Sequence, residues 1–551
     1  MSALEVARKT RSKKEKQAAL AGAFSRIAQD EGAGSESLAT AARLVLGQVL
    51  PPASGRTTGV GWALVADTAL EVAQGGGDDL RKFSAQAGDL GDGVGLLLEA
   101  RNHSGAGLSL AEAAALFDAL SLAEGRDAKH ALLLAALKKA TPLESRYLIK
   151  ALLGELRIGV QRGLLEEGIA AAFGHTIAAL RKAAQVVSDV GRLAQLAAKN
   201  ELAQTSFQPG EPLAFMLATP VEQVKEPVDP KRFIAEDKLD GIRVQVQAQG
   251  GKVWLFARGQ GEVTRSFPEL AAAFAPLAGP LVLDGEIVAV TPDGRARPFQ
   301  ALQGRLGRVN PSEQLQAEIP LAVFAYDVMV DRGEVLLEQP WTARRERLEK
   351  VTAALANPRV KLNPVLPLDA EKDLAAQLDA YFAQARARGN EGLVLKQIDA
   401  PYDAGRRGSA WRKVKRALAT LDVVVTRAEW GHGKRTGVLS DYTFAVWDGE
   451  KLVEIGKAYS GLTDAEIAMM TDRFQRITVE RRGHQHIVKP EVVLEVAFDG
   501  LQKSSRHSSG FALRFPRIAR IRDDKQPHEA DTLAAAQALW DAQVESGHRE
   551  E

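Results

Sequence analysis

Lys238 lies in a short segment whose residue types can carry out covalent phosphoryl chemistry. Residues 236–243 read Glu-Asp-Lys-Leu-Asp-Gly-Ile-Arg, which brings together an amine, carboxylates, a flexible glycine and an arginine. A lysine amine attacks phosphorus when its surroundings lower its pKa and align a phosphoryl group with it. The segment predicts a lysine nucleophile, and a surface lysine on a strand is the alternative that this segment alone leaves open.

Three segments further along the chain hold the other residue types that such a reaction needs. They are Leu-Asp-Gly-Glu at 283–286, Glu-Gly-Leu-Val-Leu-Lys at 391–396 and Trp-Arg-Lys-Val-Lys at 411–415. Carboxylates such as Glu286 and Glu391 are suited to Mg²⁺, and fixed cations stabilise charge that builds on phosphate oxygens. Strand alternation predicts that Lys413 and Lys415 project from one face. Together the segments favour nucleotidyl transfer.

The composition is that of a folded protein with several domains. At 551 residues the chain exceeds what one core supports, so about two to four domains are expected. No apolar run is long enough to span a bilayer, and the first residues are polar and basic. The absence of cysteine excludes disulfides and cysteine zinc sites, which fits a cytoplasmic location. With a net charge of +1, any affinity for nucleic acid must come from local basic faces.

Changes in sequence texture predict three domains. Residues 1–207 are rich in Ala and Leu with helical periodicity, and Thr-Pro-Leu-Glu at 141–144 is a helix start with a capping box. Strand-like runs alternate with helical stretches over 208–417, after a linker rich in Pro and Gly. Short β-like runs over 418–551 predict a small barrel. The expected fold class is therefore multidomain, with an all-α, an α+β and a β-barrel part.

The order and spacing of these segments resemble the motifs of the covalent nucleotidyltransferases, which comprise DNA ligases, RNA ligases and mRNA capping enzymes. The matching segments are 238–243 (motif I), 256–259 (Ia), 284–286 (III), 324–327 (IIIa), 391–396 (IV) and 411–415 (V). Residues 511–525 are similar to motif VI of ATP-dependent DNA ligases. The resemblance covers roughly residues 210 to 530. It implies an adenylation domain of the nucleotidyltransferase, ATP-grasp-like type, followed by an OB-fold domain.

The resemblance also implies roles for individual residues. Lys238 is expected to become AMP-lysine, with ATP as cofactor. The expected ATP-binding residues are Glu236, Arg243, Arg258, Glu286, Phe324, Arg407, Lys413, Lys415, Arg520, Arg522 and Lys525. Among them, Glu236 is expected to recognise adenine, Phe324 to stack on it, and the last three to orient the pyrophosphate leaving group. Glu286 and Glu391 are the expected ligands of Mg²⁺, with Mn²⁺ as the alternative ion.

The first part of the chain resembles the DNA-binding domain of archaeal and eukaryotic ATP-dependent DNA ligases. The matching segments are 88–92, which read Gly-Asp-Leu-Gly-Asp, and 147–159. Such a domain grips duplex DNA across the minor groove with helix N-termini and backbone amides, which reconciles DNA binding with a net charge of +1. The expected contacts are Arg157, Gly159 and Arg162, and an ordinary helix–helix turn is the alternative interpretation.

The predicted function is an ATP-dependent DNA ligase that acts as a monomer on nicked double-stranded DNA, with no membrane association. NAD-dependent ligases are disfavoured because they carry a cysteine zinc site, and this chain has no cysteine. An RNA ligase or guanylyltransferase remains an alternative that tests with RNA and GTP distinguish. An inactive DNA-binding scaffold is a further alternative, disfavoured by the intact Lys238, Glu391 and lysine pair. The cellular role and the recruiting partners stay open.

Overall fold

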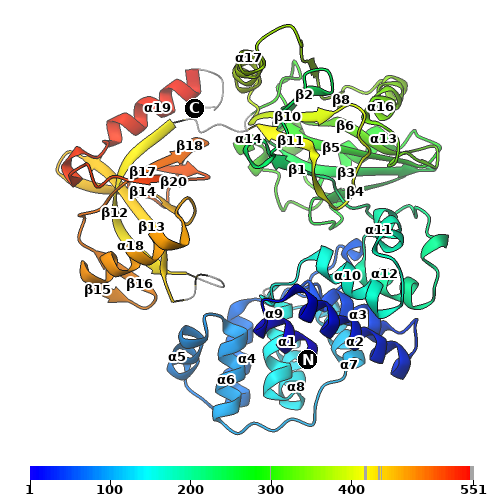
Figure 1. The fold of residues 1–551 in the computed structure, drawn as a ribbon, viewed down its shortest axis with the longest axis vertical. Coiled ribbons are helices and arrows are strands. Elements are labelled where there is room, and N and C mark those ends of the chain that lie inside the picture. The colour runs from blue at the N-terminus through cyan, green and yellow to red at the C-terminus, as the bar shows by residue number, and fades with distance from the viewer. Residues whose placement is uncertain (155, 298, 415–418, 432–434, 436, 546–551) are drawn as a thin grey trace.

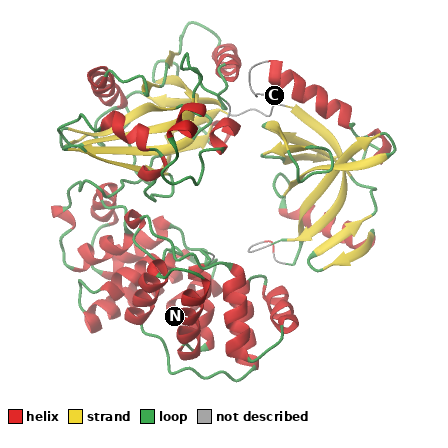
Figure 2. Cartoon of the chain, turned by 180° about the vertical axis from the view of Figure 1, so that it is seen from behind, coloured by secondary structure: helices red, strands yellow, loops and turns green. Residues whose placement is uncertain are grey.

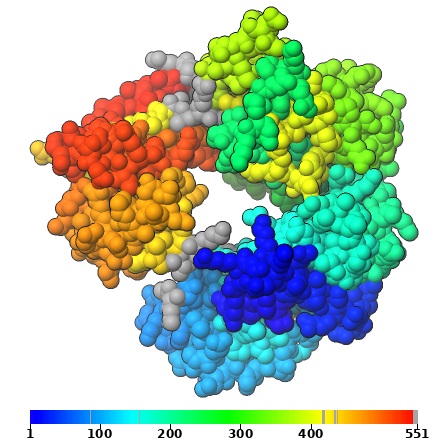
Figure 3. All heavy atoms as spheres, in the orientation of Figure 1, coloured from blue at the N-terminus to red at the C-terminus, as the bar shows by residue number. Residues whose placement is uncertain are grey.

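The computed structural model describes residues 1–551 apart from 155, 298, 415–418, 432–434, 436 and 546–551. It contains a helical unit, an α+β unit and a β-rich unit, in that order along the chain (Figure 1). Seen from behind, helices fill the first unit and strands dominate the third (Figure 2). In the space-filling view, the three units surround a central opening (Figure 3). The chain is therefore multidomain, as its sequence texture predicts.

The helical unit packs its helices around one continuous apolar core. Its helices are α1 (Ser2–Lys9), α2 (Lys13–Glu31), α3 (Glu36–Val45), α4 (Trp62–Ala73), α5 (Gly77–Ala87), α6 (Leu90–Ala100), α7 (Leu110–Leu122), α8 (Arg126–Lys139), α9 (Pro142–Leu152), α10 (Arg162–Ala172), α11 (Ile177–Val186) and α12 (Val190–Ala198). Helix α9 begins as predicted. The Thr141 hydroxyl accepts from the Glu144 N–H at 3.3 Å, and the Glu144 carboxylate accepts from the Thr141 N–H at 2.9 Å.

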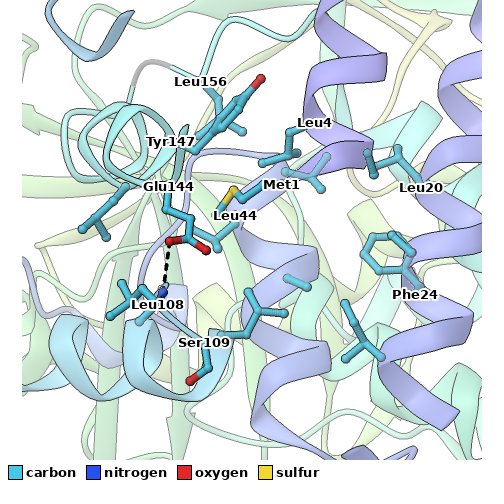
Figure 4. Close-up of a pocket in the computed structure, with 18 of the residues that line it drawn as sticks. Met1, Leu4, Leu20, Phe24, Leu44, Leu108, Ser109, Glu144, Tyr147 and Leu156 are labelled. Atoms are coloured by element: carbon cyan, nitrogen blue, oxygen red, sulfur yellow. Dashed lines mark hydrogen bonds between the residues drawn. The ribbon is translucent and has the colours of Figure 1, made fainter. Parts of the chain in front are cut away.

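A cavity of about 270 Å³ lies inside this unit, among α1, α2, α3, α7 and α9 (Figure 4). Its walls are mainly aliphatic and aromatic, with Leu4, Phe24 and Tyr147 among them. Glu144 is its carboxylate, and that group already accepts from the backbone N–H of Leu108 at 3.0 Å. The cavity lacks the paired carboxylates and clustered cations that phosphoryl transfer needs, so its lining does not suit that chemistry.

The α+β unit contains two sheets with helices on their outer faces. Its elements are β1 (Leu217–Pro220), β2 (Phe233–Lys238), β3 (Ile242–Gln249), β4 (Lys252–Ala257), α13 (Pro268–Phe274), β5 (Leu281–Ala289), α14 (Phe299–Gln303), α15 (Glu313–Glu318), β6 (Leu321–Asp331), β7 (Glu334–Val335), α16 (Trp341–Leu355), β8 (Val360–Leu362), β9 (Val365–Pro367), α17 (Leu374–Ala387), β10 (Gly392–Gln397) and β11 (Arg407–Val414). One sheet has five strands in the order β1-β11-β10-β2-β9. The other has six, in the order β4-β3-β5-β6-β7 with β8 beside β6.

The outer faces of both sheets are apolar and covered by helices. Ala235, Leu393 and Leu395 of the five-stranded sheet pack with Phe382 of α17. On the six-stranded sheet, Val323 and its neighbours pack with Leu270 of α13 and with α16. Because side chains alternate along a strand, the polar residues between these apolar positions point to the other face of each sheet. Those inner faces are where the predicted catalytic residues lie.

The third unit is rich in strands, which enclose a second apolar core. Its elements are β12 (Ala419–Trp430), β13 (Leu439–Asp448), β14 (Lys451–Ala458), α18 (Asp464–Arg476), β15 (Thr478–Arg482), β16 (Gln485–Val488), β17 (Val493–Phe498), β18 (Gly500–Lys503), β19 (Phe511–Arg514), β20 (Arg517–Ile521) and α19 (Leu533–Glu545). A seven-stranded sheet runs β14-β13-β12-β16-β15, with β17 joining β12 to β20, and β18 pairs only with β19 among the described strands. The β-rich character is as predicted.

None of the helices in the described parts of the chain is long and apolar enough to cross a lipid bilayer.

Candidate active site

Three neighbouring strands of the six-stranded sheet present predicted site residues side by side. Arg243 on β3 lies opposite Glu286 on β5, and Glu286 in turn lies opposite Phe324 on β6. Residues directly opposite one another in an antiparallel pair point to the same face of the sheet. The pairing register therefore brings together three residues that are far apart in the sequence.

The five-stranded sheet has a corresponding row. Glu236 on β2 lies opposite Val394 on β10, and Val394 lies opposite Lys413 on β11. Lys238 is two residues further along β2 and so shares the face of Glu236. The Lys396 amine, on β10, donates to the backbone oxygen of Tyr326 on β6 at 2.8 Å, so the inner faces of the two sheets are in contact.

Lys238 is held by a carboxylate. Its amine donates to Glu391 Oε2 at 2.5 Å, and the two side chains are 23% and 18% exposed. The backbone N–H of Glu391 also donates to the Lys238 oxygen, at 2.8 Å. Because backbone and side chain are both fixed, the amine stands at a defined position on the inner face, with limited access to solvent.

Glu286 is a second carboxyl group close to this amine. Burial raises the pKa of Glu286 to about 8; the charges of Lys238 and Arg243 oppose this rise, and those of Asp284 and Glu391 add to it. Oxygen ligands from one or two carboxylates, completed by substrate phosphates, suit Mg²⁺. Among the described residues no group of three or more His, Asp or Glu could hold a metal ion by itself, and Glu286 and Glu391 are the two carboxylates near the Lys238 amine that could contribute oxygen ligands.

Gly241, in the turn between β2 and β3, permits a close approach of two strands. A Cβ atom there would lie 2.3 Å from the backbone oxygen of Ile287 and 2.8 Å from Cγ of Glu286. Every residue larger than glycine would therefore push the Lys238 segment away from β5. Glycine is needed at this position because there is no room for a Cβ atom, and not because the backbone has a positive φ angle.

Arg243 is bound by protein groups. Its Nε and Nη2 atoms donate to Asp284 at 3.0 and 2.6 Å, and the Tyr402 hydroxyl donates to the same carboxylate at 2.7 Å. The guanidinium lies over the ring of Phe215 at 4.7 Å and near that of Trp411 at 5.7 Å. The charge of Asp284 holds the pKa of Arg243 well above its ordinary value, against the effect of burial. In this structure Arg243 joins the two sheets.

The remaining predicted nucleotide contacts lie around the same faces, with different exposure. Phe324 and Lys413 are half-buried, whereas Arg258, just after β4, and Arg407, at the start of β11, are exposed. Lys415 lies outside the described residues. Alternation along β11 places Lys413 on the same face as Trp411, and the expected common face of Lys413 and Lys415 stays a prediction.

The predicted pyrophosphate-orienting residues are not gathered at Lys238. Within the β-rich unit, Arg520 binds Glu495 at 2.6 Å, while Arg522 and Lys525 both bind Asp422, at 2.8 and 2.6 Å. Arg514, earlier in the same motif-like segment, instead reaches the α+β unit, where it donates to Asp240 at 2.9 Å. Asp240 and Arg514 line a small pocket that Glu391 also lines.

The predicted DNA contacts lie at one turn of the helical unit. Arg157 and Gly159 have positive φ angles of 51° and 64°, and Arg157 donates to the backbone oxygen of Gly88 at 3.3 Å. The two segments that resemble a DNA-binding domain are therefore adjacent. Arg162 donates to Glu166 at 2.9 Å and to the Ser188 oxygen at 2.8 Å, so its guanidinium also stabilises the turn.

Several residues of the site were not singled out by sequence reasoning. Asp284 and Tyr402 hold Arg243, and Lys396 and Asn363 hold Glu236. Asp284 and Lys396 lie within the segments 283–286 and 391–396. A charged residue at an inner-face position of a buried strand is the sequence feature that could have identified them. Tyr402 and Asn363 carry no comparable signal, because each acts on a residue more than a hundred positions away in the sequence.

A lysine amine set between carboxylates, on the inner faces of two sheets that also carry arginine and lysine, defines a nucleotidyltransferase. Family models confirm this class and refine it. Those described as "DNA ligase N terminus", "ATP dependent DNA ligase domain" and "ATP dependent DNA ligase C terminal region" match residues 2–170, 215–415 and 435–525.

Full-length relatives agree with the family models. The chain is 43% identical over 474 residues to a protein named "Probable DNA ligase" of Koribacter versatilis, covering 83% of this chain and 82% of that protein. It is 35% identical over 519 residues to a DNA ligase of Methanopyrus kandleri, covering 91% and 92%. The chain belongs to the ATP-dependent DNA ligase family. The predicted family, enzyme class and nucleotide cofactor are thereby confirmed.

A solved structure titled "Pmar-Lig_PreS3" shares the fold. Its TM-score is 0.61 at 16% identity, with 95% of this chain and 98% of that chain covered. At that identity the likeness concerns the fold alone.

Proposed function

We propose that this ligase seals nicks in duplex DNA in three steps that begin at Lys238. The Lys238 amine attacks the α-phosphorus of ATP; an N–P bond forms, the P–O bond to the β-phosphate breaks, and pyrophosphate leaves. A 5′-phosphate oxygen at the nick next attacks that phosphorus, which transfers AMP to DNA and frees the amine. The 3′-hydroxyl then attacks the 5′-phosphate, loses its proton to solvent and expels AMP.

The contact between Lys238 and Glu391 carries this proposal. It holds an amine at 2.5 Å from a carboxylate on an inner face that also bears Glu236 and Lys413. We assign Glu286 and Glu391 to Mg²⁺, with Mn²⁺ as a substitute; the bound ion would neutralise charge on phosphate oxygens. Glu236 and Phe324 are assigned to adenine.

The cations around the site are assigned to the ribose and phosphates. Lys413 and Lys415 serve the α-phosphate in this proposal, and Arg243, Arg258 and Arg407 serve the ribose or phosphates. Because Arg243 is bound to Asp284, its role includes holding the β2–β3 turn at the nucleotide.

The proposal assigns the three units to residues 1–207, 208–417 and 418–551. The β-rich unit is proposed to be an OB-fold that closes on ATP and brings Arg520, Arg522 and Lys525 to the pyrophosphate, and later moves to DNA. The helical unit is proposed to hold the nicked duplex through the turn that contains Arg157, Gly159 and Arg162. The enzyme acts as a monomer in this scheme.

Sealing of a 5′-labelled nicked duplex tests the proposal. Product is expected with ATP and divalent metal, and not with NAD or GTP. Transfer of label from α-³²P-ATP to the protein tests the nucleophile: Lys238→Ala is expected to abolish labelling, whereas Lys350→Met, on the exposed side of α16, is expected to retain it. Labelling of Lys238→Ala at the wild-type level would remove Lys238 as the nucleophile, and sealing with NAD alone would contradict the choice of cofactor.

A further inference from the structure

Glu236 is a buried carboxylate with one oxygen bound and the other without a partner. The residue is 1% exposed. Its Oε2 atom accepts from the Lys396 amine at 2.9 Å and from Asn363 Nδ2 at 3.1 Å. Its Oε1 atom is buried and has no hydrogen-bond partner among the described residues. A buried acceptor without a donor is costly, so Oε1 is suited to a donor that a ligand supplies.

The unpartnered oxygen belongs to the face that carries the nucleophile. Glu236 and Lys238 point to one face of β2, and Ala235 and Asp237 point to the other. On that other face Ala235 packs in the apolar cluster that includes Phe382 of α17. Two residues along a strand span about 7 Å. A ligand whose donor meets Glu236 therefore extends along β2 toward the Lys238 amine.

The two donors that hold Oε2 are themselves fixed. Lys396 is 1% exposed; its amine donates to the Tyr326 oxygen at 2.8 Å and lies 4.7 and 4.5 Å from the ring centres of Tyr326 and Trp411. Asn363 Nδ2 also donates to the Asp237 oxygen at 2.9 Å. Because both donors are anchored, the carboxylate is held in one orientation and keeps Oε1 available.

We propose that Lys396 is a positioning residue for nucleobase selection: with Asn363 it binds Oε2 of Glu236, so that Oε1 accepts from the exocyclic amino group of adenine. This inference rests on the proposed adenylation of Lys238. A base with a carbonyl oxygen at the same position, such as hypoxanthine or guanine, would bring one acceptor against another.

Charge supports the same role. Burial raises the pKa of Glu236, and the neighbouring Lys396 charge opposes that rise. Lys396 thus favours the ionised carboxylate, which only accepts hydrogen bonds. A protonated Glu236 would be able to donate to a carbonyl, and the distinction between amino and carbonyl bases would weaken.

The test compares labelling of Lys238 by ATP, by inosine triphosphate and by purine riboside triphosphate, which has no exocyclic group. Lys396→Met is expected to reduce the preference for ATP over each analogue by about 10- to 100-fold. Lys396→Arg, which retains a cation, is expected to restore most of the preference. Asn363→Ala keeps the ion pair of Lys396 with Glu236, so it is expected to lower the preference for ATP by a smaller factor than Lys396→Met. It also provides a second measurement if Lys396→Met fails to fold.

The outcomes separate a positioning role from a structural one. Equal losses with all three nucleotides in both Lys396→Met and Asn363→Ala would overturn the proposal, because a defect of folding does not depend on the base. The control variant Lys350→Met is expected to keep the wild-type preference. If wild-type protein forms no nucleotidyl-lysine with any of the three, the proposed function itself fails, which is a different result from an unchanged preference.

Discussion

At the scale of single residues, the two carboxylates proposed to hold Mg²⁺ are also neighbours of the Lys238 amine. Glu391 holds the amine at 2.5 Å, and Glu286 lies close enough for the Lys238 charge to affect its pKa. Both carboxylates are also the proposed ligands of Mg²⁺. An ion held by these carboxylates would supply positive charge beside the phosphates, and the Lys238 amine would then share its carboxylate partner with that ion.

Glu286 gives a prediction about stability and pH. Its pKa is raised by folding to about 8 from 4.5, so its contribution is complete below 4.5 and is lost as pH rises toward 8, when the buried group must ionise. Glu286→Gln stays neutral. In metal-free buffer, this variant is expected to gain about 1 kcal/mol or more of unfolding free energy over wild type between pH 5 and pH 8.

Denaturant unfolding at several pH values measures this gain. Glu346→Gln is the control: Lys350 lowers the pKa of Glu346, so this exposed carboxylate is ionised throughout pH 5–8 and its replacement is expected to change stability by an amount that does not vary over that range. A difference between Glu286→Gln and wild type that stays constant across the range would show that Glu286 is ionised throughout.

At the scale of secondary structure, the sequence predicts strands and motifs better than it predicts their partners. The strand around 411–414 and the capping box at 141–144 both follow local patterns, and the structure has a strand and a capping box there. The rows that join Arg243, Glu286 and Phe324 depend on strand register, which no local pattern specifies. The ion pairs within the β-rich unit could not be predicted from local sequence either. Arg522, for example, pairs with Asp422, which lies one hundred residues earlier in the chain.

The turn between β2 and β3 gives a prediction at this scale. Gly241→Ala is expected to lower labelling of Lys238 by about 100-fold or more, because the added Cβ would meet the Ile287 oxygen at 2.3 Å and displace the nucleophile by the order of 1 Å. Gly22→Ala in α2 is the control, since nothing lies within 4 Å of its Cβ and alanine favours a helix. Labelling of Gly241→Ala at the wild-type level, measured with α-³²P-ATP, would show that β5 can shift to accommodate the Cβ atom without displacing Lys238.

At the scale of the whole molecule, Arg514 of the motif-like segment joins the β-rich unit to the α+β unit, whereas the predicted pyrophosphate-orienting residues pair with carboxylates inside the β-rich unit. Arg514 binds Asp240, two residues after the nucleophile, whereas Arg522 and Lys525 bind Asp422. The units surround an opening (Figure 3). In the proposed closure on ATP, Arg522 and Lys525 would exchange Asp422 for phosphate, while the pair of Arg514 and Asp240 would keep one side of the β-rich unit attached.

The contribution of the Arg514–Asp240 pair to the arrangement of the units can be measured in solution. Arg514 and Asp240 are 16% and 13% exposed, so their pair is partly shielded from solvent and salt. Arg514→Asp places two like charges at this contact and is expected to increase the radius of gyration in small-angle scattering without DNA. The double variant Asp240→Arg with Arg514→Asp restores opposite charges and is expected to recover the compact value.

Arg517→Asp provides the control for that experiment. Arg517 binds Asp499 at 3.2 Å inside the β-rich unit, so this variant applies the same charge change beside the Asp240–Arg514 pair without replacing either member of it. Equal expansion by Arg514→Asp and Arg517→Asp would locate the effect in the β-rich unit alone. Expansion by Arg514→Asp that the double variant reverses would instead identify the pair as a tether, which keeps the β-rich unit beside Lys238 before the nucleotide arrives and shortens the path that closure must cover.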